Sequence, residues 1–126
     1  MDLCDISIIK PLLAEHGFRF SKSKGQNFLT ARWVPERIVC ESGVDSGCGV
    51  LEIGPGIGVL TSELCRAAKR VCAVELDKLL IPVLGTTLEE FDNVSVVEGD
   101  ILKLDIPALV RREFPGLRPC VCANLP

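Results

Sequence analysis

The fold is decided by the stretch Gly49-Val50-Leu51-Glu52-Ile53-Gly54-Pro55-Gly56-Ile57-Gly58-Val59-Leu60-Thr61. Its apolar first half predicts a buried parallel strand, and the residues after the last glycine return to helical spacing. Between them, three glycines at alternating positions predict a tight turn, since a Cβ would block both the turn and a ligand's approach. A strand, a glycine turn and a helix in this order are typical of sites that bring main chain against a nucleotide-like ligand.

The spacing of the glycines separates two kinds of nucleotide site. The dinucleotide fingerprint Gly-x-Gly-x-x-Gly would place its third glycine at position 59, where this chain has Val59. Gly54, Gly56 and Gly58 instead follow Gly-x-Gly-x-Gly after the acidic Glu52. This spacing fits an S-adenosylmethionine site better than a pyrophosphate site. A glycine-rich turn that binds nothing stays an alternative at this point.

Strand and helix patterns alternate along the chain, which predicts βαβ units and a parallel sheet. The expected strands are 50–53, 70–74, 93–97 and 119–123, and the expected helices are 8–16, 35–42, 59–69, 78–91 and 107–114. We expect Pro11 in the first turn of its helix, Gly17 and Gly43 as helix stops, and Asp105 as a cap. The side chains expected to face inward from the middle helix are Leu60, Leu64, Ala67 and Ala68.

Composition limits the class of protein. The chain has 126 residues, 48% of them hydrophobic, and a positive mean hydropathy of +0.34, which indicates a single globular domain. No apolar run approaches the roughly 20 residues of a membrane span. Seven cysteines without a Cys-x-x-Cys pair, and one histidine, argue against a disulfide framework and a zinc site. We therefore expect a cytoplasmic protein without a membrane or metal partner.

Basic residues gather before the glycine turn. Residues 1–40 carry a net charge of +2, whereas residues 41–126 carry −5. The basic side chains between 16 and 37 are Arg19, Lys22, Lys24, Arg32 and Arg37. Such a cluster is usually solvated surface, but beside a nucleotide-like site it also suggests contact with phosphate groups.

Polar side chains follow the expected strands where those strands end. Glu75 and Asp77 follow the second strand, Asp100 the third and Asn124 the fourth. Glu75 lies 21 residues after Gly54, close to the spacing of a carboxylate that accepts hydrogen bonds from ribose hydroxyls. Because ligands lie at the carboxyl ends of parallel strands, these groups favour a ligand site over unrelated caps.

Five segments occur in the order of a known family. They are Phe18 to Leu29 (FRFSKSKGQNFL), Leu51 to Gly58 (LEIGPGIG), Glu75 to Asp77 (ELD), Gly99 to Leu102 (GDIL) and Asn124 to Pro126 (NLP). The chain resembles the bacterial ribosomal RNA adenine N6-dimethyltransferases, which modify two adjacent adenines of small-subunit RNA. The segment from His16 to Lys22 looks more like this group than like the related large-subunit methyltransferases of macrolide resistance.

The resemblance implies a fold and an organisation. The fold would be a Rossmann-like class I methyltransferase sheet, incomplete with strands one to four, behind an N-terminal extension of helices and loop. Residues 1–46 would form the N-terminal helices and the basic loop that contacts cofactor and RNA, and residues 47–126 a partial S-adenosylmethionine-binding domain. The partners would be ribosomal RNA and the small ribosomal subunit.

The resemblance also assigns roles to residues. Glu75 would bind the ribose hydroxyls of S-adenosylmethionine, and Asp100 the adenine amino group, with Ile101 packed on the ring. The other cofactor-binding residues would be Gln26, Asn27, Leu29, Gly54, Gly56, Gly58 and Asn124. The catalytic motif would be Asn124, Leu125 and Pro126, in which the Asn124 side chain and the Leu125 carbonyl bond the target amino group. The RNA-binding residues would be Arg19, Lys22 and Lys24.

The chain also departs from the family. Members are more than twice as long, and an aromatic residue that would stack on the target base follows their Asn-Leu-Pro motif. We therefore expect an N-terminal half that binds cofactor without full activity, with its fourth strand as an unprotected edge.

Three functions remain as hypotheses. They are an RNA adenine dimethyltransferase of the small-subunit or large-subunit type, a nicotinamide-dependent oxidoreductase domain, and a non-catalytic RNA-binding module. Val59 in place of a third glycine argues against the oxidoreductase.

Overall fold

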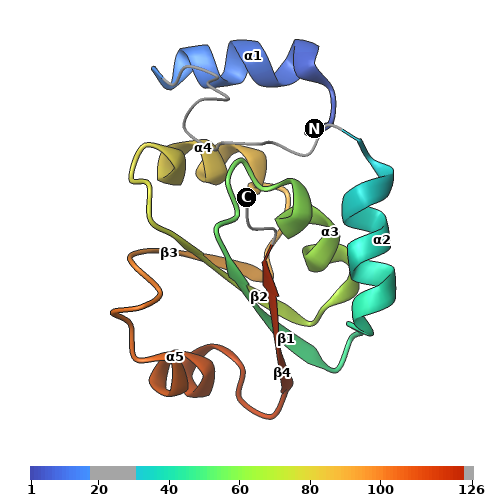
Figure 1. Ribbon diagram of the computed structural model, residues 1–126, viewed down its shortest axis with the longest axis vertical. Helices are drawn as coiled ribbons and strands as arrows, with labels where there is room; N and C mark the ends of the chain where they lie inside the picture. Colours follow the sequence, from blue (N-terminus) through green and yellow to red (C-terminus); the bar gives the residue numbers. More distant parts are fainter. Residues whose placement is uncertain (18–30, 124–126) are drawn as a thin grey trace.

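A four-stranded parallel sheet forms the centre of the computed structural model, which describes residues 1–17 and 31–123 (Figure 1). Its strands are β1 (Cys48–Ile53), β2 (Arg70–Glu75), β3 (Val94–Glu98) and β4 (Arg118–Ala123). They lie in the order β3-β2-β1-β4, so the direction of strand addition reverses between β1 and β4. In such sheets ligands bind outside the carboxyl ends of the strands, at this reversal. The four predicted strands are confirmed.

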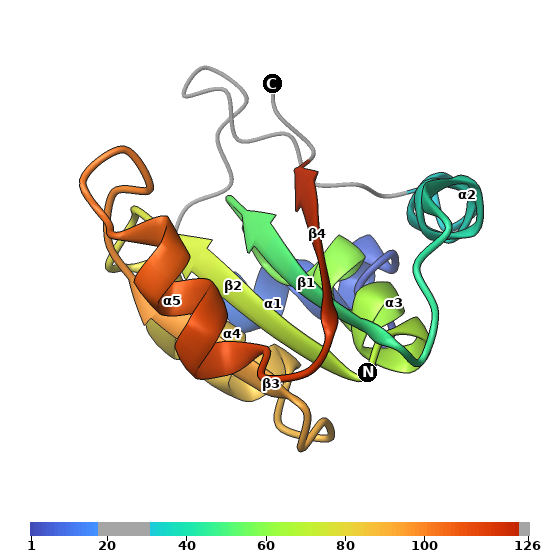
Figure 2. The ribbon, with the colours of Figure 1, turned by 90° about the horizontal axis from the view of Figure 1, so that it is seen from below.

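Helices cover both faces of the sheet. Their bounds are α1 (Ile6–Glu15), α2 (Trp33–Ser42), α3 (Val59–Ala67), α4 (Leu80–Thr87) and α5 (Ile106–Glu113). Figure 2 shows α5 on one face and α3 on the opposite face, with β4 at an edge of the sheet. The described part of the chain contains no helix that is both long and apolar enough to cross a membrane.

The alternation of side chains along β1 divides the core into two layers. Cys48 and Val50 pack with Leu60 and Leu64 of α3, while Leu51 packs on the other face with residues of α5. A third cluster joins α1 to the start of α3 and to α4; its buried members include Ile9, Leu12, Leu13, Ile57, Val59, Leu80 and Val83. Figure 1 shows α1 lying over α4 at one end of the sheet. The prediction of inward-facing residues in α3 is confirmed for three side chains, whereas Ala67 is half-buried.

The first helix begins earlier than the sequence pattern predicts. Asp5 caps it by accepting a hydrogen bond from the Ser7 amide, so α1 starts at Ile6. Pro11 therefore lies in the interior of the helix, and its placement in the first turn was wrong. Proline has no amide hydrogen, so the helix lacks one main-chain hydrogen bond at Pro11. The helix tolerates this loss because its buried face packs against α4 and the glycine turn.

The fourth helix is shorter than predicted. The Leu79 amide donates to the Asp77 carboxylate at 2.9 Å, which holds a turn where a helix from residue 78 was expected. Pro82 consequently falls in the first turn of α4, where its missing amide costs little. The predicted Gly43 stop of α2 is confirmed by its φ of 75°, and the predicted Asp105 cap of α5 by its bond to the Ala108 amide.

One glycine of β1 is required by packing. A Cβ built on Gly49 would lie 2.3 Å from the ring of Phe114, which follows α5 and is 3% exposed. The aromatic ring therefore packs directly on the β1 backbone, and this contact fixes the end of α5 against the sheet.

Candidate cofactor site

Predicted residues that follow the first three strands come together at the end of the sheet where the parallel strands have their carboxyl ends, which we call the carboxyl edge. A cavity of about 140 Å³ opens there. Its lining residues are Ile53, Gly54, Val74, Glu75, Leu76, Gly99, Asp100 and Ile101. The structure thus brings one predicted glycine, two of the three strand-end carboxylates and the predicted apolar contact to one opening, whereas Asp77 is not among the described lining residues.

The glycine turn has the backbone that its sequence predicts. Gly54, Gly56 and Gly58 have φ angles of 69°, 61° and 95°, in the left-handed region that side chains disfavour. A Cβ on Gly54 would meet no atom of the described residues within 4 Å, so these residues leave space for a ligand there. At Gly58 a Cβ would lie 3.1 Å from the Thr87 hydroxyl, so this glycine also lets α4 pack closely. Of the three glycines of the turn, Gly54 alone is among the described residues that line the cavity.

Glu75 joins the glycine turn to the end of β2. One carboxylate oxygen accepts from the Gly56 amide at 3.1 Å, and the other accepts from the Asp77 amide at 2.9 Å. The residue is 6% exposed, so these two bonds hold its carboxylate in one orientation beside the cavity. A carboxylate oxygen has two lone pairs, so each keeps acceptor capacity for a hydroxyl group of a ligand.

The end of β3 supplies the opposite wall. The Gly99 amide donates to the Glu75 carbonyl at 2.9 Å, which places Asp100 next to β2. The Asp100 carboxylate accepts a hydrogen bond from the Leu102 amide at 3.0 Å, and Asp100 is half-buried. Ile101 packs against the apolar cluster under α5 and lines the cavity. The wall therefore offers a carboxylate beside an apolar surface, which suits a flat heterocycle with an amino group.

Sequence reasoning treated Glu52 only as the acidic residue before the glycines and missed its environment. Glu52 is 1% exposed, near the carboxyl end of β1, and its carboxyl group accepts a hydrogen bond from the Thr61 hydroxyl of α3. Burial, together with the negative charge of Glu75, raises the pKa of Glu52 to about 8, against a lowering by the Thr61 bond. The signal was present in the sequence, because an acid inside an apolar strand pattern is expected to be buried.

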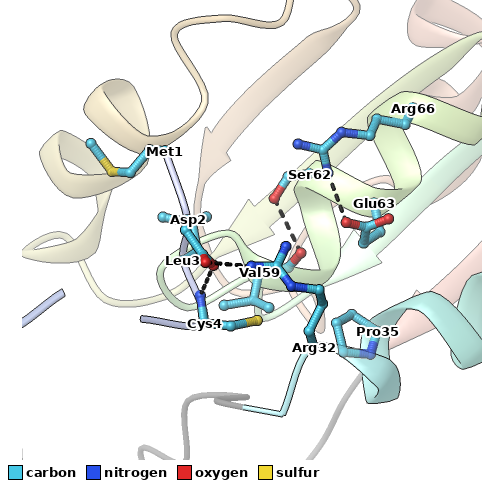
Figure 3. Close-up of a pocket in the computed structure, with 10 residues that line it drawn as sticks. All are labelled: Met1, Asp2, Leu3, Cys4, Arg32, Pro35, Val59, Ser62, Glu63 and Arg66. Atoms are coloured by element: carbon cyan, nitrogen blue, oxygen red, sulfur yellow. Dashed lines mark hydrogen bonds and ion pairs between the residues drawn. The ribbon is translucent and has the colours of Figure 1, made fainter. Parts of the chain in front are cut away.

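A second hollow lies between the N-terminal segment and α3 (Figure 3). Its volume is about 30 Å³, close to the share of one water molecule in the liquid. Polar groups around it are already paired, Arg32 with Asp2 and Arg66 with Glu63. The first pair joins the N-terminal segment to the start of α2, and the second lies within α3. The hollow is too small for a nucleotide-like ligand.

Several predicted residues lie outside the described residues. They are Arg19, Lys22, Lys24, Gln26, Asn27, Leu29, Asn124, Leu125 and Pro126. The two described members of the basic cluster have acidic partners, since Arg32 pairs with Asp2 and Arg37 pairs with Glu41 at 2.9 Å. The described part of the cluster is therefore occupied by ion pairs on the protein surface.

A parallel sheet with a glycine turn after its first strand and carboxylates after its second and third defines the Rossmann-like class of nucleotide-binding domains. Solved structures of methyltransferases share it. The chain matches a dimethyladenosine transferase from Plasmodium falciparum with a TM-score of 0.60 and 30% identity, over 75% of this chain and 32% of that one. It matches the 23S rRNA methyltransferase ErmE with a TM-score of 0.59 and 37% identity, over 62% and 32%.

Sequence comparison identifies the family. Residues 17–126 match the family described as ribosomal RNA adenine dimethylase. The ribosomal RNA small subunit methyltransferase A of Streptococcus pneumoniae is 46% identical over 127 aligned residues, which cover 100% of this chain and 44% of that protein. The chain belongs to the ribosomal RNA adenine dimethylase family, and it spans less than half the length of this relative. The predicted family is confirmed.

Proposed function

We propose that this chain forms the cofactor-binding part of an enzyme that transfers methyl groups from S-adenosylmethionine to the N6 atoms of adenines in small-subunit ribosomal RNA. The observation that supports it most directly is the cavity at the carboxyl edge. In a member of this family, the carboxylates that we assign to the ribose and to the adenine both line this opening, beside an apolar wall.

The residues of the cavity fit the nucleoside portion of the cofactor. Glu75 is oriented by two main-chain amides and offers its remaining lone pairs to the ribose hydroxyls. Asp100 accepts from the adenine amino group, while Ile101 packs on the ring. Gly54 leaves room for the methionine portion, since no atom of residues 1–17 and 31–123 lies within 4 Å of where its Cβ would be. When bound, S-adenosylmethionine supplies an electrophilic methyl group.

The remaining roles in this proposal fall on residues outside the described part of the chain. Gln26, Asn27 and Leu29 complete the cofactor contacts. Asn124, also a cofactor contact, and the Leu125 carbonyl hold the target amino group, with Pro126 shaping the motif. Holding nucleophile and methyl group in line requires neither metal nor covalent intermediate, because positioning supplies most of the acceleration. Arg19, Lys22 and Lys24 contact RNA phosphates in a sequence-independent way.

The test of the proposed function is calorimetric titration of the chain with S-adenosylmethionine, S-adenosylhomocysteine and NAD. We expect both S-adenosyl compounds to bind and NAD to give no heat of binding. Binding of NAD without a response to either S-adenosyl compound would return the site to the oxidoreductase class.

A second candidate function concerns the substrate. The 37% identity to ErmE supports large-subunit RNA as the alternative. Transfer of labelled methyl groups to undermethylated small-subunit particles, compared with transfer to 23S RNA, separates the two. The 46% identity to a small-subunit methyltransferase favours the former.

A further inference from the structure

Glu52 and Thr61 form a buried hydrogen bond directly behind the glycine turn. Thr61 is 0% exposed and lies in the first turn of α3, while Glu52 lies in β1. The turn from Gly54 to Gly58 connects these two elements, so the bond closes the base of the loop. A change in the charge of Glu52 therefore alters the bond that joins the two ends of the loop that borders the cavity.

In the part of the chain that the structure describes, the titratable groups that face Glu52 come from three elements, and none of them is positively charged. Cys65 of α3, Cys122 of β4 and Glu75 of β2 interact with it electrostatically. Burial raises the pKa of Cys65 to about 12 and also raises that of Cys122, so both thiols stay neutral near pH 7. Glu75 is an acid, and among residues 1–17 and 31–123 no ion pair involves Glu52. Burial therefore penalises the ionised form of Glu52, and no cation among residues 1–17 and 31–123 compensates for it.

We propose that Glu52 is a proton-linked positioning residue of the cofactor site, which holds a proton in the free chain and releases it when a positively charged ligand binds beside Glu75. The inference rests on the proposed function, because S-adenosylmethionine carries this charge as its sulfonium and S-adenosylhomocysteine does not. Proton release leaves Glu52 as a carboxylate that still accepts from Thr61. The chain then distinguishes the charged methyl donor from the neutral product by charge as well as by shape.

Linkage gives the inference a measurable consequence. A cation close to a carboxyl group lowers its pKa, and a ligand that lowers a pKa binds more tightly as the pH rises. Each pKa unit corresponds to a tenfold change in affinity. A sulfonium that lowers the pKa of Glu52 by about one unit therefore raises the affinity for S-adenosylmethionine, relative to S-adenosylhomocysteine, about tenfold between roughly pH 6 and pH 9.

The experiment is calorimetry of the chain with both compounds across this pH range, in buffers that differ in ionisation enthalpy. The matched variant is E52Q, whose amide has the shape of the protonated carboxyl group and can still bond Thr61. The amino group of each ligand titrates with both proteins, so the difference between wild type and E52Q isolates Glu52. We expect proton release on binding of S-adenosylmethionine by the wild type, with the proton release and the rise in relative affinity both abolished in E52Q.

A direct measurement keeps the test valid if E52Q folds poorly. Carbon NMR of the Glu52 carboxyl group in the wild-type chain is expected to show a midpoint well above the ordinary glutamate value, and a lower midpoint with S-adenosylmethionine than with S-adenosylhomocysteine. An ordinary midpoint in the free chain, or equal midpoints with the two bound compounds, overturns the inference while leaving the proposed function intact. Failure of both compounds to bind contradicts the proposed function and the inference together.

Discussion

The amino ends of the parallel strands form one edge of the sheet, and their carboxyl ends form the opposite edge. Each of these two edges has a glycine from the segment 49–54, and the two glycines serve opposite purposes. At the amino edge, Gly49 leaves room for Phe114, whose ring would clash with a Cβ at 2.3 Å. At the carboxyl edge, Gly54 lines the cavity, and none of the described residues fills the space where its Cβ would be. The space beside the first glycine is filled by a side chain of the protein, whereas the space beside the second is available to a ligand.

Polar groups at the two edges differ in the same way. At the amino edge, Arg118 donates to the Cys48 sulfur at 3.0 Å and pairs with Asp45 at 3.4 Å. A hydrogen bond from the Asp45 amide, together with the one from Arg118, lowers the pKa of the Cys48 thiol. At the carboxyl edge, Glu75 is held by main-chain amides and no ion pair among the described residues neutralises it. The polar groups at the amino edge are paired with one another, whereas the carboxyl edge presents oriented hydrogen-bond acceptors.

The largest expected effect concerns the buried acid of the carboxyl edge. The pKa of Glu52 is raised in the folded chain, so its contribution to stability is complete below the unfolded value of 4.5 and is lost as the pH rises towards about 8. The free energy of unfolding should fall by about 1.4 kcal/mol per pH unit within this window. Urea unfolding between about pH 5 and pH 8 measures it. The same series on E52Q should be nearly flat, and equal slopes for the two proteins would show that Glu52 ionises normally.

The next effect tests whether the oriented acceptors bind cofactor. Glu75→Ala should weaken binding of S-adenosylhomocysteine by on the order of 2–4 kcal/mol, because two charge-assisted hydrogen bonds to the ribose are lost. Glu98→Ala is the matched control, since Glu98 is paired with Glu75 in the sheet register and is exposed. It should change the affinity little. Equal losses in the two variants would mean that the ligand lies elsewhere.

A third prediction compares the two glycines directly. Gly49→Ala should lower the free energy of unfolding by roughly 1–3 kcal/mol, because the methyl group overpacks against Phe114. Gly54→Ala should cost roughly 1 kcal/mol, from its φ of 69° alone, but should weaken cofactor binding as well. Chemical unfolding and calorimetry on both variants separate these effects. Similar losses of cofactor affinity in the two would remove the distinction between the edges.

The smallest effect concerns two basic residues that lie outside the described part of the chain. Charge reversal at Lys22 and Lys24 should weaken RNA binding and flatten its salt dependence, while affinity for S-adenosylhomocysteine stays unchanged. Filter binding at several salt concentrations measures it. An unchanged salt slope in the variant would return the basic cluster to ordinary solvated surface.

Local patterns were sufficient for most of the fold and for part of the site. The glycine spacing and the 21-residue distance to Glu75 predicted groups that the structure places around one cavity. The starts of α1 and α4 were missed because Asp5 and Asp77 each bond a nearby amide and thereby move the helix boundary. Contacts between distant segments, such as Phe114 on Gly49, have no local signature, because the sheet pairs residues far apart in the sequence.

The most direct test of the difference between the edges is a titration of the nitrogen-15-labelled chain with S-adenosylhomocysteine, followed by NMR. We predict that the amide signals of Gly54, Gly56 and Gly99 shift with the ligand, while those of Cys48 and Arg118 stay in place. Shifts centred on the amino edge, or saturable binding without any change at the glycine turn, would contradict the placement of the cofactor site.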